Sequence, residues 1–175
     1  TIDRLHGLLR LHAPVCSVPV LRDFHAENLI WLSNRQAGAR VGLLDFQDAV
    51  IGHPAYDLVS LTRDARRDLG PGVCAQTTER YLAGSMLDRE AFLIAAAVLS
   101  VQRNLRILGV FVRLAFVAEK HNYLDLMPRV WGHLMCDLAH PALVDLAGLI
   151  TDSLPPPEAH LLTRLKAACP QPPAH

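Results

Sequence analysis

Acidic and amide side chains gather in two short segments near the start of the chain. Asp23 and Asn28 stand in D-x-x-x-x-N spacing in VLRDFHAENLIWL, on a loop expected between two short strands, and Asp45 ends the next expected strand in VGLLDFQDAVIGHPAYDLVSL. Phosphoryl transfer to a hydroxyl needs one carboxylate to accept the proton, and an amide oxygen and a second carboxylate to hold Mg²⁺ on the phosphates. The three side chains supply all of these groups.

A plainer interpretation exists for each segment taken alone. Asp and Asn are common turn residues, so Asp23 and Asn28 could cap a turn and Asp45 could begin a loop. The presence of both segments, in this order along the chain, favours a role in phosphoryl transfer instead. Strand ends would also fix the separations of these groups, and catalysis of phosphoryl transfer is mostly positioning and charge neutralisation.

Apolar spacing predicts the elements that position these residues. The expected fold class is α+β and mainly α, with a small β-hairpin unit followed by a helical bundle. Strands are expected at 18–21, 29–32 and 41–44, with a hairpin turn at 33–39. Helices are expected at 1–11, 56–69, 73–83, 88–119, 123–137, 141–151 and 158–168. Asp88 is expected to be the N-cap of the longest helix, with Glu90 in its first turn.

Composition narrows the class of protein. Lys+Arg and Asp+Glu number 17 each, so the net charge is zero and gives no field that would attract nucleic acid or an anionic membrane. The most apolar stretch, 92–117, contains too many polar groups for a membrane span; they are Gln102, Arg103, Asn104, Arg106 and Arg113. The four cysteines are far apart and form no CxxC pair, and the start has no signal-peptide pattern. A reduced, cytoplasmic protein is therefore expected.

The two motifs resemble those of the aminoglycoside phosphotransferase and choline kinase-like family. RDFHAEN is similar to the catalytic loop HGDxHxxN, and LLDFQDAVIGHPAYDL is similar to the metal-binding segment IDWxxxxxGDPxxDL. The resemblance implies the C-terminal lobe of a protein-kinase-like fold, with ATP and Mg²⁺ as cofactors. It implies that Asp23 is the base, that His25 supports the loop, that Asn28 and Asp45 bind the metal, and that Asp57 is structural.

Three positions depart from the family pattern. Arg22 replaces the usual Gly before the base, Phe46 replaces the usual Trp, and His53 replaces the usual Asp. None of these changes removes a reacting group, but Arg22 and His53 bear on the fine geometry of the site.

A narrower resemblance extends outside the two motifs. LRDFHAENLIWL, GLLDFQDA, GHPAYDLVSLTRDARRD, QRNLRILGVFVRL and PRVWGHL are similar to blocks of the anomeric N-acetylmuramate/N-acetylglucosamine kinases of peptidoglycan recycling. This resemblance implies a small-molecule sugar as the substrate, phosphorylated by ATP on its 1-hydroxyl.

The polar residues of the longest helix are candidates for binding the acceptor. Arg103, Asn104 and Arg106 interrupt an apolar pattern, and burying an unpaired guanidinium is costly, so they should face a polar cleft or a partner acid such as Asp57 or Asp64. The many arginines after the metal segment favour a neutral or anionic acceptor. Trp31 and Trp131 are expected to pack in the core rather than to stack on a sugar ring.

The domain organisation expected is a kinase-like lobe at 1–152 and a Pro-rich linker, short helix and tail at 153–175. The lobe would contain the catalytic loop at 22–28, the metal segment at 45–57 and a helical substrate subdomain at 73–152. A kinase also needs a Gly-rich loop over the phosphates and a paired lysine, whereas Lys120 and Lys166 are the only lysines and both come late in the chain.

The expected partner is therefore the missing N-terminal nucleotide-binding lobe of the same protein, without which the chain would be inactive. Two alternatives stay open at this point. One is a kinase for an aminoglycoside or a choline-type acceptor, and the other is an inactive lobe that acts as a binding module.

Overall fold

The computed structural model describes residues 1–15 and 18–170, so Cys16 and residues 171–175 of the expected Pro-rich tail lie outside the described residues. The chain forms two compact units, one made of residues 7–99 and the other of residues 1–6 with the segment from 100 onward. Helices α1 (Ile2–His12) and α4 (Arg89–Val117) each contribute residues to both units. The domain boundaries expected from the sequence stay a prediction.

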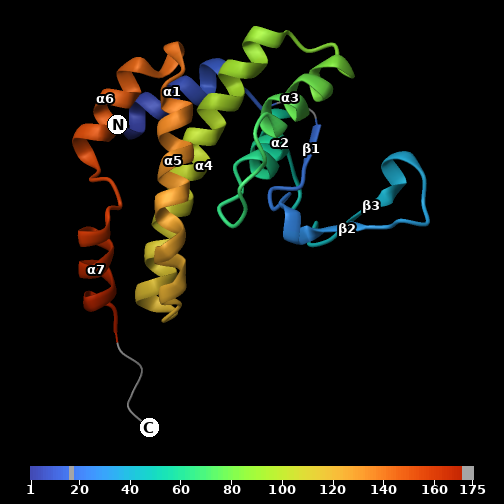
Figure 1. The fold of residues 1–175 in the computed structure, drawn as a ribbon. Helices are drawn as coiled ribbons and strands as arrows, with labels where there is room; N and C mark the ends of the chain where they lie inside the picture. Colours follow the sequence, from blue (N-terminus) through green and yellow to red (C-terminus); the bar gives the residue numbers. More distant parts are fainter. Residues whose placement is uncertain (16–17, 171–175) are drawn as a thin grey trace. The chain divides into compact units, whose positions relative to one another are not determined.

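Two short antiparallel ladders organise the first unit. Strand β1 (Val18–Val20) pairs with β4 (Val50–Gly52), and β2 (Leu29–Trp31) pairs with β3 (Val41–Leu43), which lies beside it in Figure 1. A 3-10 helix, η2 (Ala37–Arg40), lies in the hairpin connection between β2 and β3. Strand β4 was not expected from the sequence.

The hairpin is open to solvent. Trp31 is 66% exposed, so the expectation that it packs in the core is wrong. The guanidinium of Arg40 lies 5.8 Å from the centre of the Trp31 ring. A two-stranded sheet offers too little surface to bury both of its faces.

Helices also contribute to the first unit. They are α2 (Ala55–Thr62), α3 (Val73–Ala83) and the first part of α4. Their shared core is a cluster of buried apolar side chains, namely Ala55, Leu58, Leu82, Phe92 and Leu99. Helix α3 has the bounds expected from the sequence.

Helix α2 ends seven residues before its expected end, at Thr62 instead of 69. The next residue, Arg63, leaves the helical region with φ −118° and ψ 38°. The buried carboxylate of Asp64 then accepts a hydrogen bond from the backbone N–H of Arg66 at 2.9 Å. Such a local side-chain bond offers the backbone an alternative to continuing the helix.

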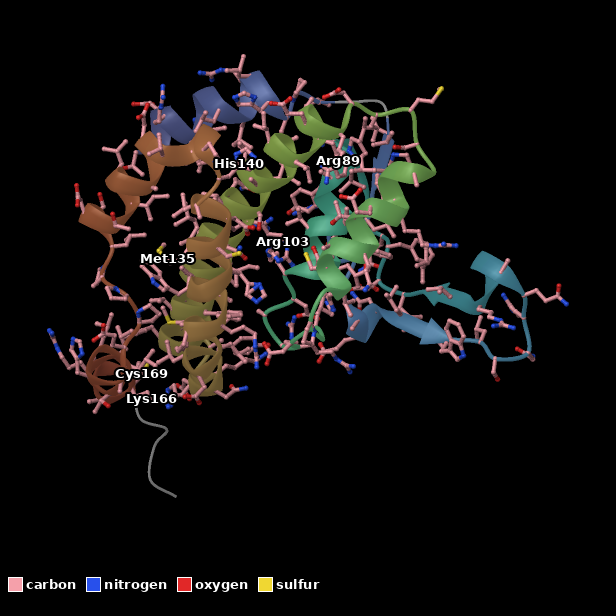
Figure 2. The ribbon with its side chains drawn as sticks, turned by 45° about the horizontal axis from the view of Figure 1, so that its top comes forward. Arg89, Arg103, Met135, His140, Lys166 and Cys169 are labelled. Atoms are coloured by element: carbon pink, nitrogen blue, oxygen red, sulfur yellow. The ribbon has the colours of Figure 1, made fainter. Side chains whose placement is uncertain are left out.

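The second unit is helical. It contains the later part of α4, the 3-10 helices η3 (His121–Leu126) and η4 (Pro141–Leu143), and the helices α5 (Met127–Leu138), α6 (Val144–Ser153) and α7 (Ala159–Ala168). Its fully buried apolar side chains include Leu124, Val130, Leu134, Leu143, Leu146 and Ile150. Lys166, which projects from α7 in Figure 2, forms an exposed ion pair with Asp125 of η3 at 2.5 Å. The predicted α+β, mainly helical fold with a small β-hairpin unit is confirmed.

Among the described residues, α4 is long and apolar enough by itself to cross a membrane, and the bent pair 121–138 and 141–153 passes the same test together. Core helices of soluble proteins share these properties, and half of the most apolar window of α4 is buried inside the structure. Helix α4 also carries the buried polar side chains of Ser100 and Asn104. Ser100 donates to the Asp137 carboxylate on α5 at 2.5 Å, and the Asn104 amide donates to Ser100 at 3.2 Å. We therefore describe α4 as a core helix.

The start of α4 gives a test of local stability. The Asp88 carboxylate accepts a hydrogen bond from the backbone N–H of Ala91 at 2.8 Å, the geometry of an N-cap. We expect Asp88→Ala to lower the free energy of unfolding by about 1 kcal/mol, measured by urea denaturation. Asp88→Ser, which keeps an acceptor oxygen, is the matched control and should lose only a small part of that stability. Equal losses in the two variants would contradict the capping role.

Candidate active site

The two motif segments lie between the same pair of ladders. Residues 21–28 connect β1 to β2, and residues 44–49 connect β3 to β4. At one end Val20 pairs with Val50, and at the other Leu29 pairs with Leu43. The N–H of residue 44 also donates to the carbonyl of residue 28 at 2.9 Å, which extends the second ladder to the edge of both loops. The ladders therefore hold the two loops against each other.

Asp23 has a fixed backbone and an exposed side chain. Its N–H donates to the carbonyl of Leu21 at 2.9 Å, and its carbonyl accepts from the N–H of His25 at 3.0 Å and from the amide of Asn28 at 2.9 Å. The carboxylate itself is open to solvent. A base needs this combination, since its position must be set while its oxygen stays accessible to a substrate hydroxyl.

Hydrogen bonds fix the orientation of the Asn28 amide. Its nitrogen donates to the Asp23 carbonyl and lies 3.4 Å from Nε2 of His25. The side-chain oxygen, which is the atom able to bind a cation, is thereby turned away from these partners. An amide nitrogen can only donate, so this contact is a hydrogen bond in the tautomer of His25 that leaves Nε2 without a hydrogen. The Nδ1 of His25 is buried without a hydrogen-bond partner among the described residues.

Asp45 directly follows the β3 end of the second ladder. Its backbone lies in the left-handed region with φ +56°, a conformation that Asp tolerates better than most residues. Gln47 donates from Nε2 to Oδ1 of Asp45 at 2.5 Å, a contact that sequence reasoning missed. The described residues contain no group of three or more His, Cys, Asp or Glu that could hold a metal ion.

The residues present nevertheless fit Mg²⁺. Mg²⁺ prefers oxygen ligands and is usually bound by one or two carboxylates together with substrate phosphates and water. The Asp45 carboxylate and the Asn28 amide oxygen are donors of this kind, one on each of the paired loops. A three-residue protein cluster is therefore not required.

Helix α2 holds the start of the loop that contains Asp23 and Asn28. The Asp57 carboxylate accepts from the N–H of Leu21 at 2.7 Å and from the N–H of Arg22 at 3.0 Å. Ser60, one turn further along α2, donates from Oγ to the carbonyl of Arg22 at 3.1 Å. Sequence reasoning missed Ser60, although its i+3 spacing from Asp57 places both on one helix face and is the signal that could have found it.

His53 occupies the position of the usual Asp and caps α2. Its Nδ1 accepts a hydrogen bond from the N–H of Ala55 at 3.2 Å, and its carbonyl accepts from the N–H of Tyr56 at 3.0 Å. Burial lowers the pKa of His53 below its ordinary value. The neutral ring is the form that can accept, so the lowered pKa favours the capping state.

The acceptor-binding candidates belong to the other compact unit. Asn104 is fully buried in the network with Ser100, and its Oδ1 has no hydrogen-bond partner among the residues the structure describes. Arg103, labelled on α4 in Figure 2, is half-buried, and Arg106 is exposed. A role for these residues in binding the acceptor stays a prediction.

Comparison with known proteins agrees with the geometry. Residues 1–93 match the family model described as the phosphotransferase enzyme family, and the chain belongs to that family. It is 51% identical over 126 residues to the N-acetylmuramate/N-acetylglucosamine kinase of Caulobacter vibrioides, covering 71% of this chain and 35% of the relative. It is 35% identical over 144 residues to the kinase of the same name from Pseudomonas aeruginosa, covering 78% of this chain and 41% of the relative. The family and the narrower resemblance inferred from the motifs are thus confirmed.

The chain is shorter than these relatives. The matched part spans 35% of the Caulobacter vibrioides protein and 36% of the protein of the same name from Neisseria meningitidis, to which it is 35% identical over 124 residues and 67% of this chain. The small ladders with helices agree with the C-terminal lobe of a kinase-like fold.

The His53 cap predicts a pH dependence of stability. Since the folded-state pKa lies below the unfolded value of 6.5, stability is fully present above 6.5 and is lost as the pH falls through the folded pKa. We expect His53→Asn, which keeps an acceptor but does not titrate, to lose less stability than the parent between about pH 7 and about pH 5.

Urea denaturation at several pH values measures this slope. His6→Asn, at an exposed histidine on α1, is the control and should keep the slope of the parent. An unchanged slope in His53→Asn would show that its protonation does not matter for folding.

Proposed function

We propose that the full-length protein is an ATP-dependent kinase of N-acetylmuramate and N-acetylglucosamine, forming the 1-phosphate in peptidoglycan recycling. The observation that carries the proposal is the pairing of the two loops, with Asp23 and Asn28 on one and Asp45 on the other. The names of the relatives support the choice of acceptor. The proposal implies a cytoplasmic reaction, because ATP is supplied there.

In the proposed reaction the Asp23 carboxylate accepts the proton of the sugar 1-hydroxyl. The hydroxyl oxygen forms a bond to the γ-phosphorus of ATP, the bond from that phosphorus to the bridging oxygen breaks, and ADP leaves. The exposed Asp23 side chain on its fixed backbone suits this role. Asn28 and Asp45 would hold Mg²⁺, which supplies neutralisation of the phosphate charge when bound.

The Gly-rich loop and the paired lysine that bind the nucleotide are proposed to come from a lobe outside residues 1–175. The chain covers 35% and 41% of the two relatives above, which leaves ample length for such a lobe. The strand segments also expose large apolar side chains, including Trp31, Phe46 and Ile51 at 66%, 59% and 60%. A surface of this kind is unusual unless something covers it, and the nucleotide-binding lobe is the partner that we propose.

The choice among acceptors follows from charge. An acceptor pocket for a polycationic aminoglycoside should be rich in carboxylates, whereas α4 offers Arg103, Arg106 and Arg113. An arginine suits the lactyl carboxylate of N-acetylmuramate, because a guanidinium binds a carboxylate through two parallel hydrogen bonds. The binding role of Arg103, Asn104 and Arg106 is part of this proposal.

The base assignment is tested in the full-length protein by ADP release with Mg-ATP and N-acetylmuramate, N-acetylglucosamine or kanamycin. We expect turnover with the two amino sugars, and we expect Asp23→Asn to lower it roughly 10²–10⁴-fold because general-base catalysis is lost. Asp152→Asn, at an exposed position on α6, is the control and should keep the parent rate.

Each alternative has its own outcome in this assay. Turnover with kanamycin alone would make the protein an aminoglycoside kinase. No turnover with any of the three acceptors would favour a binding module, and an unchanged rate in Asp23→Asn would remove this residue from the mechanism.

The metal assignment predicts a change in Mg²⁺ dependence. Asp45→Asn keeps an oxygen ligand but removes its charge, so we expect the Mg²⁺ concentration for half-maximal rate to rise about tenfold or more. A titration of Mg²⁺ at fixed ATP and sugar measures it, with Asp152→Asn again as the control. A lower maximal rate at an unchanged Mg²⁺ midpoint would argue that Asp45 does not bind the metal.

A further inference from the structure

The residue before the base has an unusual conformation. Arg22 has φ +70°, in the left-handed region that side chains other than Gly rarely adopt. The N–H of Asp23 donates to the carbonyl of Leu21 at 2.9 Å, which closes a three-residue turn around Arg22. A turn of this kind with a positive central φ is the rare and strained form of the γ-turn. The conformation therefore needs support from its surroundings.

The support comes from both sides of the Arg22 backbone. Asp57 accepts its N–H at 3.0 Å, and Ser60 donates to its carbonyl at 3.1 Å. Both side chains lie on α2, whose apolar face is buried through Ala55 and Leu58 at 0% and 8% exposure. The strained residue is thus held by groups anchored in the core of the unit.

Ser60 has no other evident task. It is 0% exposed, its side chain offers little apolar surface for packing, and its hydroxyl donates a hydrogen bond to the Arg22 carbonyl. Another buried hydroxyl on α2, that of Thr62, instead donates to the carbonyl of Leu58 within the helix at 2.8 Å. The serine is therefore placed to control the loop, and the threonine is a matched comparison.

We infer that Ser60 is a positioning residue that keeps Arg22 in its left-handed conformation and thereby sets the place of the Asp23 carboxylate. The inference rests on the proposed function, because its consequence is a rate of phosphoryl transfer. Without the hydroxyl, Arg22 can relax toward a negative φ, and the following residue moves with it. With Gly at this position the left-handed conformation carries no steric cost, so the loop would no longer depend on Ser60.

The test is a double-mutant cycle in the full-length protein. We expect Ser60→Ala to lower kcat about tenfold or more, with little change in the KM of ATP or of N-acetylmuramate, because the base moves while the binding groups stay. In the Arg22→Gly background, the fold-decrease in kcat caused by Ser60→Ala should be smaller by a factor of at least about two. A difference of that size exceeds the deviation from additivity seen for independent sites. Thr62→Val should show the same effect on kcat in both backgrounds.

A second readout does not depend on activity. We expect hydrogen exchange of the backbone amides in 21–23 to become about fivefold faster in Ser60→Ala, which is the loss of one hydrogen bond, and less so in the Arg22→Gly background. Equal effects of Ser60→Ala in both backgrounds, in kcat and in exchange, would overturn the inference. If the parent shows no turnover, the proposed function fails and the exchange rates alone decide the role of Ser60.

Discussion

The loop that contains Asp23 and Asn28 begins with two backbone N–H groups that donate to a single carboxylate on α2, and the rest of the candidate site depends on that contact. Asp57 binds the N–H groups of Leu21 and Arg22 with its two oxygens. Hydrogen bonds to a charged acceptor are stronger than those between neutral groups, and losing the acceptor would leave two part-buried donors unsatisfied. The opposite face of α2 is buried in the apolar core, which fixes the position of Asp57. The hydrogen bonds from Leu21 and Arg22 to Asp57 therefore tie the start of the loop to that core.

Two residues with positive φ mark the two sides of the candidate site. Arg22 precedes Asp23, the proposed base, and Asp45 follows β3, with φ of +70° and +56°. Backbone strain persists only where the surrounding structure over-determines it, and it clusters at functional sites. Here the two strand ladders and the side chains of Asp57 and Ser60 on α2 hold the strained backbone in place. Asp45 bears the left-handed conformation more easily than Arg22, because Asp is enriched there. The larger conformational cost therefore lies at the residue before Asp23.

The sequence predicted the parts of the structure that depend on local signals. The helix at 73–83 and the Asp88 cap follow from apolar spacing and capping chemistry within a few residues. Strand β4 and the contact of Ser60 with the loop depend on interactions between residues thirty or more positions apart, which no local pattern records. The early end of α2 comes from the Asp64 side chain, which bonds to the backbone ahead of it. The order of Asp23, Asn28 and Asp45 was readable, but the atoms that hold each of them in place were not.

Two of the departures from the family pattern, at His53 and Arg22, differ in physical kind. His53 stands where the family usually has Asp, and its Nδ1 accepts the N–H of Ala55, as a carboxylate oxygen could; burial lowers the pKa of His53 and so favours the neutral ring that can accept. Arg22 stands where the family usually has Gly, and it keeps the backbone conformation at a steric cost of about 1–2 kcal/mol. A substitution of the first kind needs no compensation. A substitution of the second kind needs contacts that hold the backbone. Asp57 and Ser60 provide them, at the N–H and at the carbonyl of Arg22.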